Sequence, residues 1–240
     1  MALVLPRRML TYWLKASAVQ QQDGTVQLFD RMYIAVTNKS LGRSLIQQRG
    51  PGFEMPAQSG FGAVCETLSQ MANAGESVTA TDIQEQVEYA FASQRIRVDS
   101  MESEDISFGG PGDAITELDT IVEACQQIKQ SRHGQGFRLL TSGLVPPAET
   151  ELVVGKLQDA GIDRVTVHLA AANPKKFNEL VAPTNGCSFN DVCTFVASVA
   201  DSGIEVECTA VKAPGLRVRE VSALATSLGA SSFKTRSFHP

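Results

Sequence analysis

The chain of 240 residues is 43% hydrophobic and 20% charged, a composition typical of an ordinary globular domain. Its formal net charge is −5 and its Lys and Arg residues form no dense run, which argues against binding to a nucleic-acid backbone or to an anionic lipid surface. The sequence contains no stretch near the roughly 20 consecutive apolar residues that a membrane-spanning helix requires.

Basic and apolar residues alternate at the start of the chain. Arg7, Arg8 and Lys15 all precede the first acidic residue, Asp23, and are interleaved with Leu, Met and Trp. The pattern resembles an organellar targeting peptide, although it is poor in Ser, and it is also typical of an arm that docks onto a partner. We therefore assign residues 1–30 to an N-terminal basic arm.

A long connection separates the first strand pattern from the first helix pattern. Residues 32–37 form a strong strand pattern, and residues 81–93 form an amphipathic helix pattern that opens with a capping box, Thr81-x-x-Gln84. The connection contains many Gly, Pro, Gln and Ser residues. It predicts an inserted loop at about residues 48–78.

From residue 105 onward, strand and helix patterns alternate and Gly residues separate them. The expected strands are 106–108, 137–141, 164–169, 204–211 and 232–238. The expected helices are 118–128, 149–160, 190–202 and 218–228. With the two earlier elements this gives six strands and five helices, an alternation that predicts an α/β fold with parallel strands and outer helices. Functional residues of such folds lie on loops at the carboxyl ends of the strands.

The five cysteines, at positions 65, 125, 187, 193 and 208, show no CxxC spacing. An odd number of cysteines without a paired pattern argues against an oxidised, secreted fold and favours a reducing compartment. Cys125 and Cys208 fall on the apolar faces of an expected helix and strand, where a free cysteine acts as a small hydrophobic residue.

The strand ends carry motifs that occur in one order along the chain. They are YIAVTN at 33–38, ISFGGPGD at 106–113, LTSGL at 140–144, VTVHLAAANP at 165–174, VECTAVKAPG at 206–215 and FKTRSF at 233–238. As an ordered set they resemble the radical SAM superfamily, closest to the TatD-associated radical SAM proteins. The resemblance covers residues 32–39 and 105–240 and implies a partial (β/α)6 barrel over residues 31–240.

Members of that superfamily carry CxxxCxxC directly after the first strand, and the three thiolates hold a [4Fe–4S] cluster whose remaining iron binds S-adenosylmethionine. Alignment on Thr37 places Ser40, Ser44 and Gln47 at those positions. A neutral hydroxyl or amide is a poor ligand for cluster iron compared with a thiolate. Since Cys65 alone cannot replace three thiolates, the resemblance implies no iron–sulfur cluster, no metal site and no catalytic residue.

A second family motif is partly kept. The family uses a Gly-rich loop of the form GxGEP to contact the amino end of S-adenosylmethionine, and this chain has GPGDA at 110–114. The resemblance implies that Gly110, Gly112 and Asp113 form a vestigial S-adenosylmethionine loop, although Asp is one methylene shorter than Glu. Alternatively, the glycines form a tight turn and Asp113 caps a helix or faces water.

The histidines and one acidic loop are weaker candidates. His168 lies in the alternating pattern of an expected strand and faces either a ligand or the core. His133 lies in a polar turn, and His239 reaches a site only if the chain folds back. The acidic loop, expected to be a solvated edge, contains Glu102, Glu104 and Asp105.

We therefore expect a non-catalytic, radical SAM-like pseudoenzyme that serves as an accessory or structural subunit of a larger protein assembly. It would contact partner subunits through residues 1–30 and the 48–78 insert, and the targeting-like arm favours a mitochondrial location, with a cytoplasmic one as the alternative. The alternative function is binding of S-adenosylmethionine or a nucleotide, or catalysis, in a barrel without a cluster. A shift of the melting temperature on ligand addition distinguishes the two.

Overall fold

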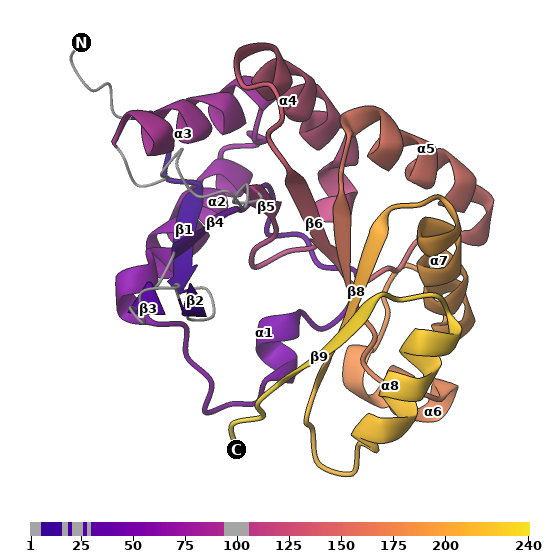
Figure 1. The fold of residues 1–240 in the computed structure, drawn as a ribbon. Helices are drawn as coiled ribbons and strands as arrows, with labels where there is room; N and C mark the ends of the chain where they lie inside the picture. The colour runs from indigo at the N-terminus through magenta and orange to yellow at the C-terminus, as the bar shows by residue number, and fades with distance from the viewer. Residues whose placement is uncertain (1–5, 16–18, 21–25, 28–29, 94–105) are drawn as a thin grey trace.

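The computed structural model describes residues 6–15, 19–20, 26–27, 30–93 and 106–240. Within this part of the chain, a curled seven-stranded sheet forms a half-barrel with most helices on its convex side (Figure 1). In sheet order its strands are β1 (Thr11–Lys15), β4 (Asp30–Ile34), β5 (Ile106–Phe108), β6 (Phe137–Thr141), β7 (Arg164–His168), β8 (Glu205–Val211) and β9 (Ser232–Arg236). Strand β1 is antiparallel to β4, and all other neighbours are parallel. In a separate two-stranded sheet, β2 (Val19–Gln20) pairs antiparallel with β3 (Val26–Gln27).

The helices follow the strands in the expected alternation. They are α1 (Leu45–Gln48), α2 (Phe61–Asn73), α3 (Ala80–Ala92), α4 (Leu118–Ser131), α5 (Thr150–Ala160), α6 (Pro174–Val181), α7 (Phe189–Asp201) and α8 (Val218–Ser227). The six strands and five helices expected from the sequence are confirmed, and the half-barrel is the expected α/β architecture. Among the described residues, no helix combines the length and apolar character needed to cross a membrane.

The two faces of the sheet differ in chemistry. One row of paired residues on the convex face, against the helices, consists of Phe108, Leu139, Val165 and Val206, all almost completely buried. Burial of each such side chain contributes about 2 kcal/mol to stability. The buried polar residues of the concave face include Ser107, Arg138, Thr166, His168, Glu207 and Thr209.

The capping box of helix α3 lies two residues before the expected one. The cap is formed by Thr79 and Asp82: Thr79 Oγ1 accepts from the Asp82 amide at 3.1 Å, and the Thr79 amide donates to Asp82 Oδ2 at 2.9 Å. The prediction of Thr81 and Gln84 was wrong because the extended backbone required of a cap occurs at Thr79, whereas Thr81 already lies within the helix.

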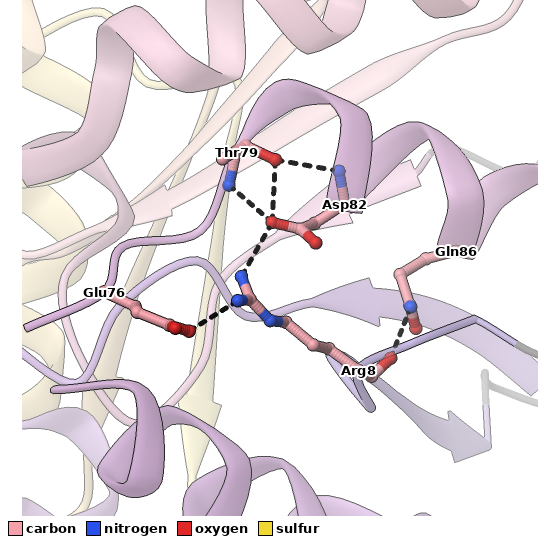
Figure 2. Close-up of polar contacts among 5 residues, drawn as sticks. All are labelled: Arg8, Glu76, Thr79, Asp82 and Gln86. Atoms are coloured by element: carbon pink, nitrogen blue, oxygen red, sulfur yellow. Dashed lines mark hydrogen bonds and ion pairs between the residues drawn. The ribbon is translucent and has the colours of Figure 1, made fainter. Parts of the chain in front are cut away.

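Part of the expected N-terminal arm is built into the folded body. Arg8 forms ion pairs with Asp82 at 3.0 Å and with Glu76, and its backbone carbonyl accepts from Gln86 Nε2 at 2.6 Å (Figure 2). Leu10 is fully buried, and the strand that follows it pairs with β4. Strand β1, with the sequence TYWLK, therefore forms one edge of the sheet.

The expected insert at 48–78 contains helix α2 rather than being a loop throughout. Phe61, Val64, Leu68 and Met71 lie on one face of α2 and are buried, a spacing of three or four residues that the surrounding Gly, Ser and Gln residues obscure in the sequence. The Phe61 ring contacts Tyr12 of β1 edge-on, with centroids 5.0 Å apart. Helix α2 thus packs against β1, the strand at the edge of the sheet.

Candidate functional site

A cavity of about 210 Å³ lies on the concave side of the half-barrel, at the carboxyl ends of the parallel strands. Its walls come from the loop after β4, from the Gly-rich loop after β5 and from strands β6 to β9. Parallel strands bring their carboxyl ends to one edge, which is where the sequence places its candidate residues. Of these, the cavity wall contains Ser40, Ser44, Gly110, Gly112, Asp113 and His168.

The loop after β4 is organised by local hydrogen bonds. The Ser40 hydroxyl donates to the carbonyl of Gly42. Ser44 and Gln47 form a capping box at the start of α1: the Gln47 amide donates to Ser44 Oγ at 3.3 Å, and the Ser44 amide donates to Gln47 Oε1 at 2.9 Å. The three side chains are therefore engaged in shaping the loop, and Gln47 is exposed outside the cavity wall.

The Gly-rich loop packs tightly against the end of β4. A Cβ atom on Gly110 would lie 2.5 Å from Ala35 Cβ, and one on Gly112 would lie 2.5 Å from the backbone carbonyl of Lys39. The Gly112 amide donates to the Thr37 carbonyl at 3.2 Å. Close backbone approach therefore explains both glycines without a ligand, as the alternative interpretation of this loop expects.

Asp113 is buried and links two of the loops. Its carboxylate accepts hydrogen bonds from the Ser142 amide at 2.9 Å, from the Ser142 hydroxyl and from the Ile115 amide at 3.4 Å. It thus caps the 3₁₀ turn at 114–117 and fixes the loop after β6. These bonds occupy much of its acceptor capacity, although the residue still borders the cavity.

His168, at the end of β7, is a buried neutral imidazole. The pKa of His168 is lowered from 6.5 to about 4, chiefly by burial and also by the charge of Arg236, while the backbone of Thr209, close to the ring, opposes the shift. Gln48 Nε2 donates to the Arg43 carbonyl at 2.7 Å, so Gln48 Oε1 is left to accept from His168 Nε2 at 2.8 Å. This assigns the proton to Nε2, and Nδ1 has no partner at hydrogen-bond geometry among the described residues. Helix α1 therefore closes over the concave face through Gln48.

A charged group lies deeper on the concave face, and the sequence interpretation missed it. Glu207 of β8 pairs with Arg138 of β6 at 3.6 Å and with Lys234 of β9 at 2.5 Å. The side chains of Arg138 and Glu207 are 6% and 4% exposed. The signal was the alternation of polar residues in VECTA and FKTR, together with the single Arg138 inside the apolar run of FRLLT, which marks the strand face opposite the apolar row.

The other candidates lie apart from the cavity wall. His133 is exposed, as expected for a polar turn. The chain does fold back at its end: the His239 amide donates to the Arg49 carbonyl at 2.7 Å, and the His239 ring lies 5.3 Å from that of Phe53. The acidic residues Glu102, Glu104 and Asp105 fall outside the described residues.

No protein-family model and no curated protein sequence matches the chain. Solved structures do match it. HydG, a maturase of the [FeFe]-hydrogenase, is 12% identical with a TM-score of 0.54, over 87% of this chain and 42% of HydG. SuiB from Streptococcus suis is 14% identical with a TM-score of 0.51, over 69% of this chain and 35% of SuiB. TsrM from Kitasatospora setae, a radical S-adenosylmethionine methyltransferase, is 14% identical with a TM-score of 0.44, over 66% of this chain and 30% of TsrM.

The chain has the partial-barrel fold of radical SAM enzymes. It spans less than half the length of each of these structures, and at such identities the likeness concerns the fold alone. The partial-barrel fold that the strand-end motifs imply is thus found in the structure.

The cysteines are spread over the radical SAM half-barrel rather than gathered at its mouth. They lie on α2, α4, α7, β8 and the segment before α7, and none borders the cavity. Burial raises the pKa of every one of these thiols, that of Cys208 to about 12. Within the described part of the chain, no group of three or more His, Cys, Asp or Glu side chains is arranged to hold a metal ion.

Proposed function

We propose that the chain is a non-catalytic, radical SAM-like pseudoenzyme that serves as an accessory or structural subunit of a larger assembly. The observation that carries the proposal is the capping box formed by Ser44 and Gln47 at the position where the family binds its cluster. Two of the side chains that would have to be iron ligands, Ser44 and Gln47, instead cap α1, and the neighbouring Gln48 holds this helix against His168 on the concave face.

The residues at this position do not fit an iron–sulfur cluster. Ser40, Ser44 and Gln47 offer neutral, hard oxygen donors, whereas cluster iron requires thiolates. The cysteines elsewhere in the chain carry raised thiol pKa values, which disfavour the thiolate form. This supports the proposed loss of radical chemistry.

Anaerobic reconstitution with ferrous iron and sulfide tests the proposal. We expect no sulfide-to-iron charge-transfer absorbance and far less than one iron per chain after desalting. A triple variant, Ser40→Cys, Ser44→Cys and Gln47→Cys, serves as the comparison, since it restores the thiolate spacing on the same loop. Stoichiometric iron and sulfide bound by the unmodified chain would refute the proposal.

The proposed partner contacts are the N-terminal segment and the 48–78 insert. Arg8 is committed to an intramolecular ion pair, so Arg7 and Met9, which is 49% exposed, are the neighbouring side chains open to a partner. We propose a mitochondrial location on the targeting-like composition of residues 1–22. Purification of the tagged chain from mitochondria should recover the same set of subunits repeatedly. Recovery of the chain as a lone monomer from the cytoplasm would contradict both the proposed partner subunits and the proposed location.

Retained binding of S-adenosylmethionine is the second candidate function. It is favoured by the position of Gly110, Gly112 and Asp113 at the cavity wall. A ligand present at 100 times its dissociation constant stabilises a protein by about 2.7 kcal/mol, which is readily seen in thermal unfolding. Unchanged unfolding with S-adenosylmethionine or a nucleotide at millimolar concentration would exclude this candidate.

A further inference from the structure

The cavity wall carries an excess of positive charge. Three guanidinium groups border it, those of Arg43, Arg49 and Arg236, against the single carboxylate of Asp113, which is engaged by Ser142. Neither Arg49 nor Arg236 forms an ion pair with any described residue. Cations that lack an acidic partner attract an anion.

Arg49 is held in place by neutral groups. Its Nε donates to the Ser237 carbonyl at 3.3 Å, and its guanidinium lies 3.7 Å from the centroid of the Phe53 ring. Burial lowers the pKa of Arg49, and the nearby charge of Arg236 lowers it further. An anion between the two arginines would relieve this repulsion, and a guanidinium is well suited to a carboxylate or a phosphate.

Two buried polar atoms on β7 lack a partner beside these arginines. The hydroxyl of Thr166 makes no hydrogen bond to any described residue; Nδ1 of His168 has no partner at hydrogen-bond geometry among them, although the backbone of Thr209 is close enough to raise the pKa of the ring, and both residues border the cavity. They lie two positions apart on the same strand and so face the same side. Buried polar groups are usually satisfied, and here the hydroxyl can donate while Nδ1 can accept. A ligand that satisfies both carries an acceptor and a donor.

The other end of the cavity is apolar. Leu14, Met55, Leu140 and the rings of Tyr12 and Tyr33 border it there. The Tyr12 and Tyr33 rings stack with centroids 5.1 Å apart, and the Tyr12 hydroxyl already donates to the Gly109 carbonyl at 3.2 Å. A dry cavity of about 150 Å³ accommodates benzene, so about 210 Å³ suits roughly one substituted ring.

We infer that the cavity binds a small organic acid that carries a hydroxyl or amino group beside its carboxylate and an apolar, ring-sized body. The carboxylate lies between Arg49 and Arg236, the donor reaches His168 Nδ1, and the apolar body rests against the tyrosines. The inference is independent of the proposed loss of the cluster, because none of these residues occupies the aligned cysteine positions or the Gly-rich loop.

Calorimetric titration with three matched probes tests it. 3-Phenyllactate carries the acid, the hydroxyl and the ring; 3-phenylpropionate lacks the hydroxyl, and 3-phenyllactamide lacks the charge. We expect saturable binding of 3-phenyllactate at millimolar concentration or below and binding at least about tenfold weaker for the other two. No saturable binding of 3-phenyllactate, or equal binding of its amide, would overturn the inference.

Two variants separate a ligand-binding role from a structural one. Arg236→Gln should weaken 3-phenyllactate binding about tenfold at an unchanged melting temperature, whereas Arg219→Gln on the surface of α8 removes the same charge without effect on binding. Thr166→Val should weaken binding severalfold while the melting temperature stays equal or rises, since the hydroxyl has no partner to lose. Unaltered affinity in both Arg236→Gln and Thr166→Val would refute the site. Cluster reconstitution in these variants reports separately on the proposed function.

Discussion

The convex and concave faces of the same sheet bury different kinds of side chain. On the convex face, apolar rows such as Phe108, Leu139 and Val165 pack against helices and are almost completely buried. On the concave face, polar and charged side chains are buried as well, and some of their atoms have no partner among the described residues. A polar interior reduces stability unless each group is paired, so its presence indicates that the concave face was retained for something other than packing.

The largest expected effect is on the convex face. Phe137 is fully buried and its ring stacks on that of Phe108 with centroids 6.1 Å apart. Phe137→Ala should lower the free energy of unfolding by about 4 kcal/mol because it leaves a cavity between sheet and helices. Urea denaturation measures the loss, and Phe137→Leu, which fills most of the space, should cost clearly less. If Phe137→Ala and Phe137→Leu lower the free energy of unfolding equally, the loss is not caused by the volume left empty on the convex face.

The buried charges on the concave face give the next effect. Glu207→Gln removes the carboxylate that both Arg138 and Lys234 approach, and we expect a loss of about 3 kcal/mol in the free energy of unfolding. Arg138→Met combined with Glu207→Gln should recover part of this loss, because the buried guanidinium that has lost this carboxylate is gone. If the double variant is no more stable than the single one, the lost attraction between Glu207 and Arg138 is not the cause.

The third effect depends on pH. The folded-state pKa of His168, about 4, lies below its ordinary value of 6.5, so between these values the unfolded chain binds a proton that the folded chain does not. The contribution of neutral His168 to the free energy of unfolding is thus complete above about pH 6.5. It falls as the pH drops toward 4, and the loss is about 2 kcal/mol at pH 5. The charge nearest to the ring is Arg236, which stays positive throughout.

Urea denaturation of the native chain and of His168→Gln at neutral pH and at pH 5 isolates this effect, since Gln does not titrate. The native chain should lose about 2 kcal/mol more than the variant on acidification. Equal losses would mean that His168 is solvated, and the concave face would then be wetter than its burial indicates.

Sequence reasoning located the C-terminal two thirds of the fold because its information there is local. Helices α4, α5, α7 and α8 were predicted from apolar residues at helical spacing, and Gly161 and Gly203 mark where two of them end, whereas the short helix α6 was not predicted. The motifs at the strand ends also singled out His168 and Asp113 as candidates, and the structure places both at the wall of one cavity. The sequence could not show which atoms of these two side chains already form hydrogen bonds, because their partners, Ser142 and Gln48, come from other segments of the chain.

The N-terminal third was harder because its structure depends on distant partners. The segment TYWLK becomes a strand through pairing with β4. The apolar residues of α2 are separated in the sequence by small and polar residues, so that their helical spacing is hard to detect. Both Thr79 and Thr81 are followed three residues later by a polar side chain, and the choice of Thr79 accompanies an ion pair between Asp82 and Arg8. Local pattern alone does not distinguish such alternatives.

The amino-acid sequence by itself determined the alternation of strands and helices, the polar and apolar faces of each strand, and the chemical kind of residue after β4, because these follow from short-range periodicity and side-chain chemistry. Tertiary structure alone decided that Ser44 and Gln47 cap a helix over the half-barrel, that Arg49 and Arg236 border one cavity without an ion pair to a described residue, and that Thr166 and His168 border the same cavity with buried polar atoms. These outcomes depend on how the curled sheet brings chain segments far apart in sequence around one cavity.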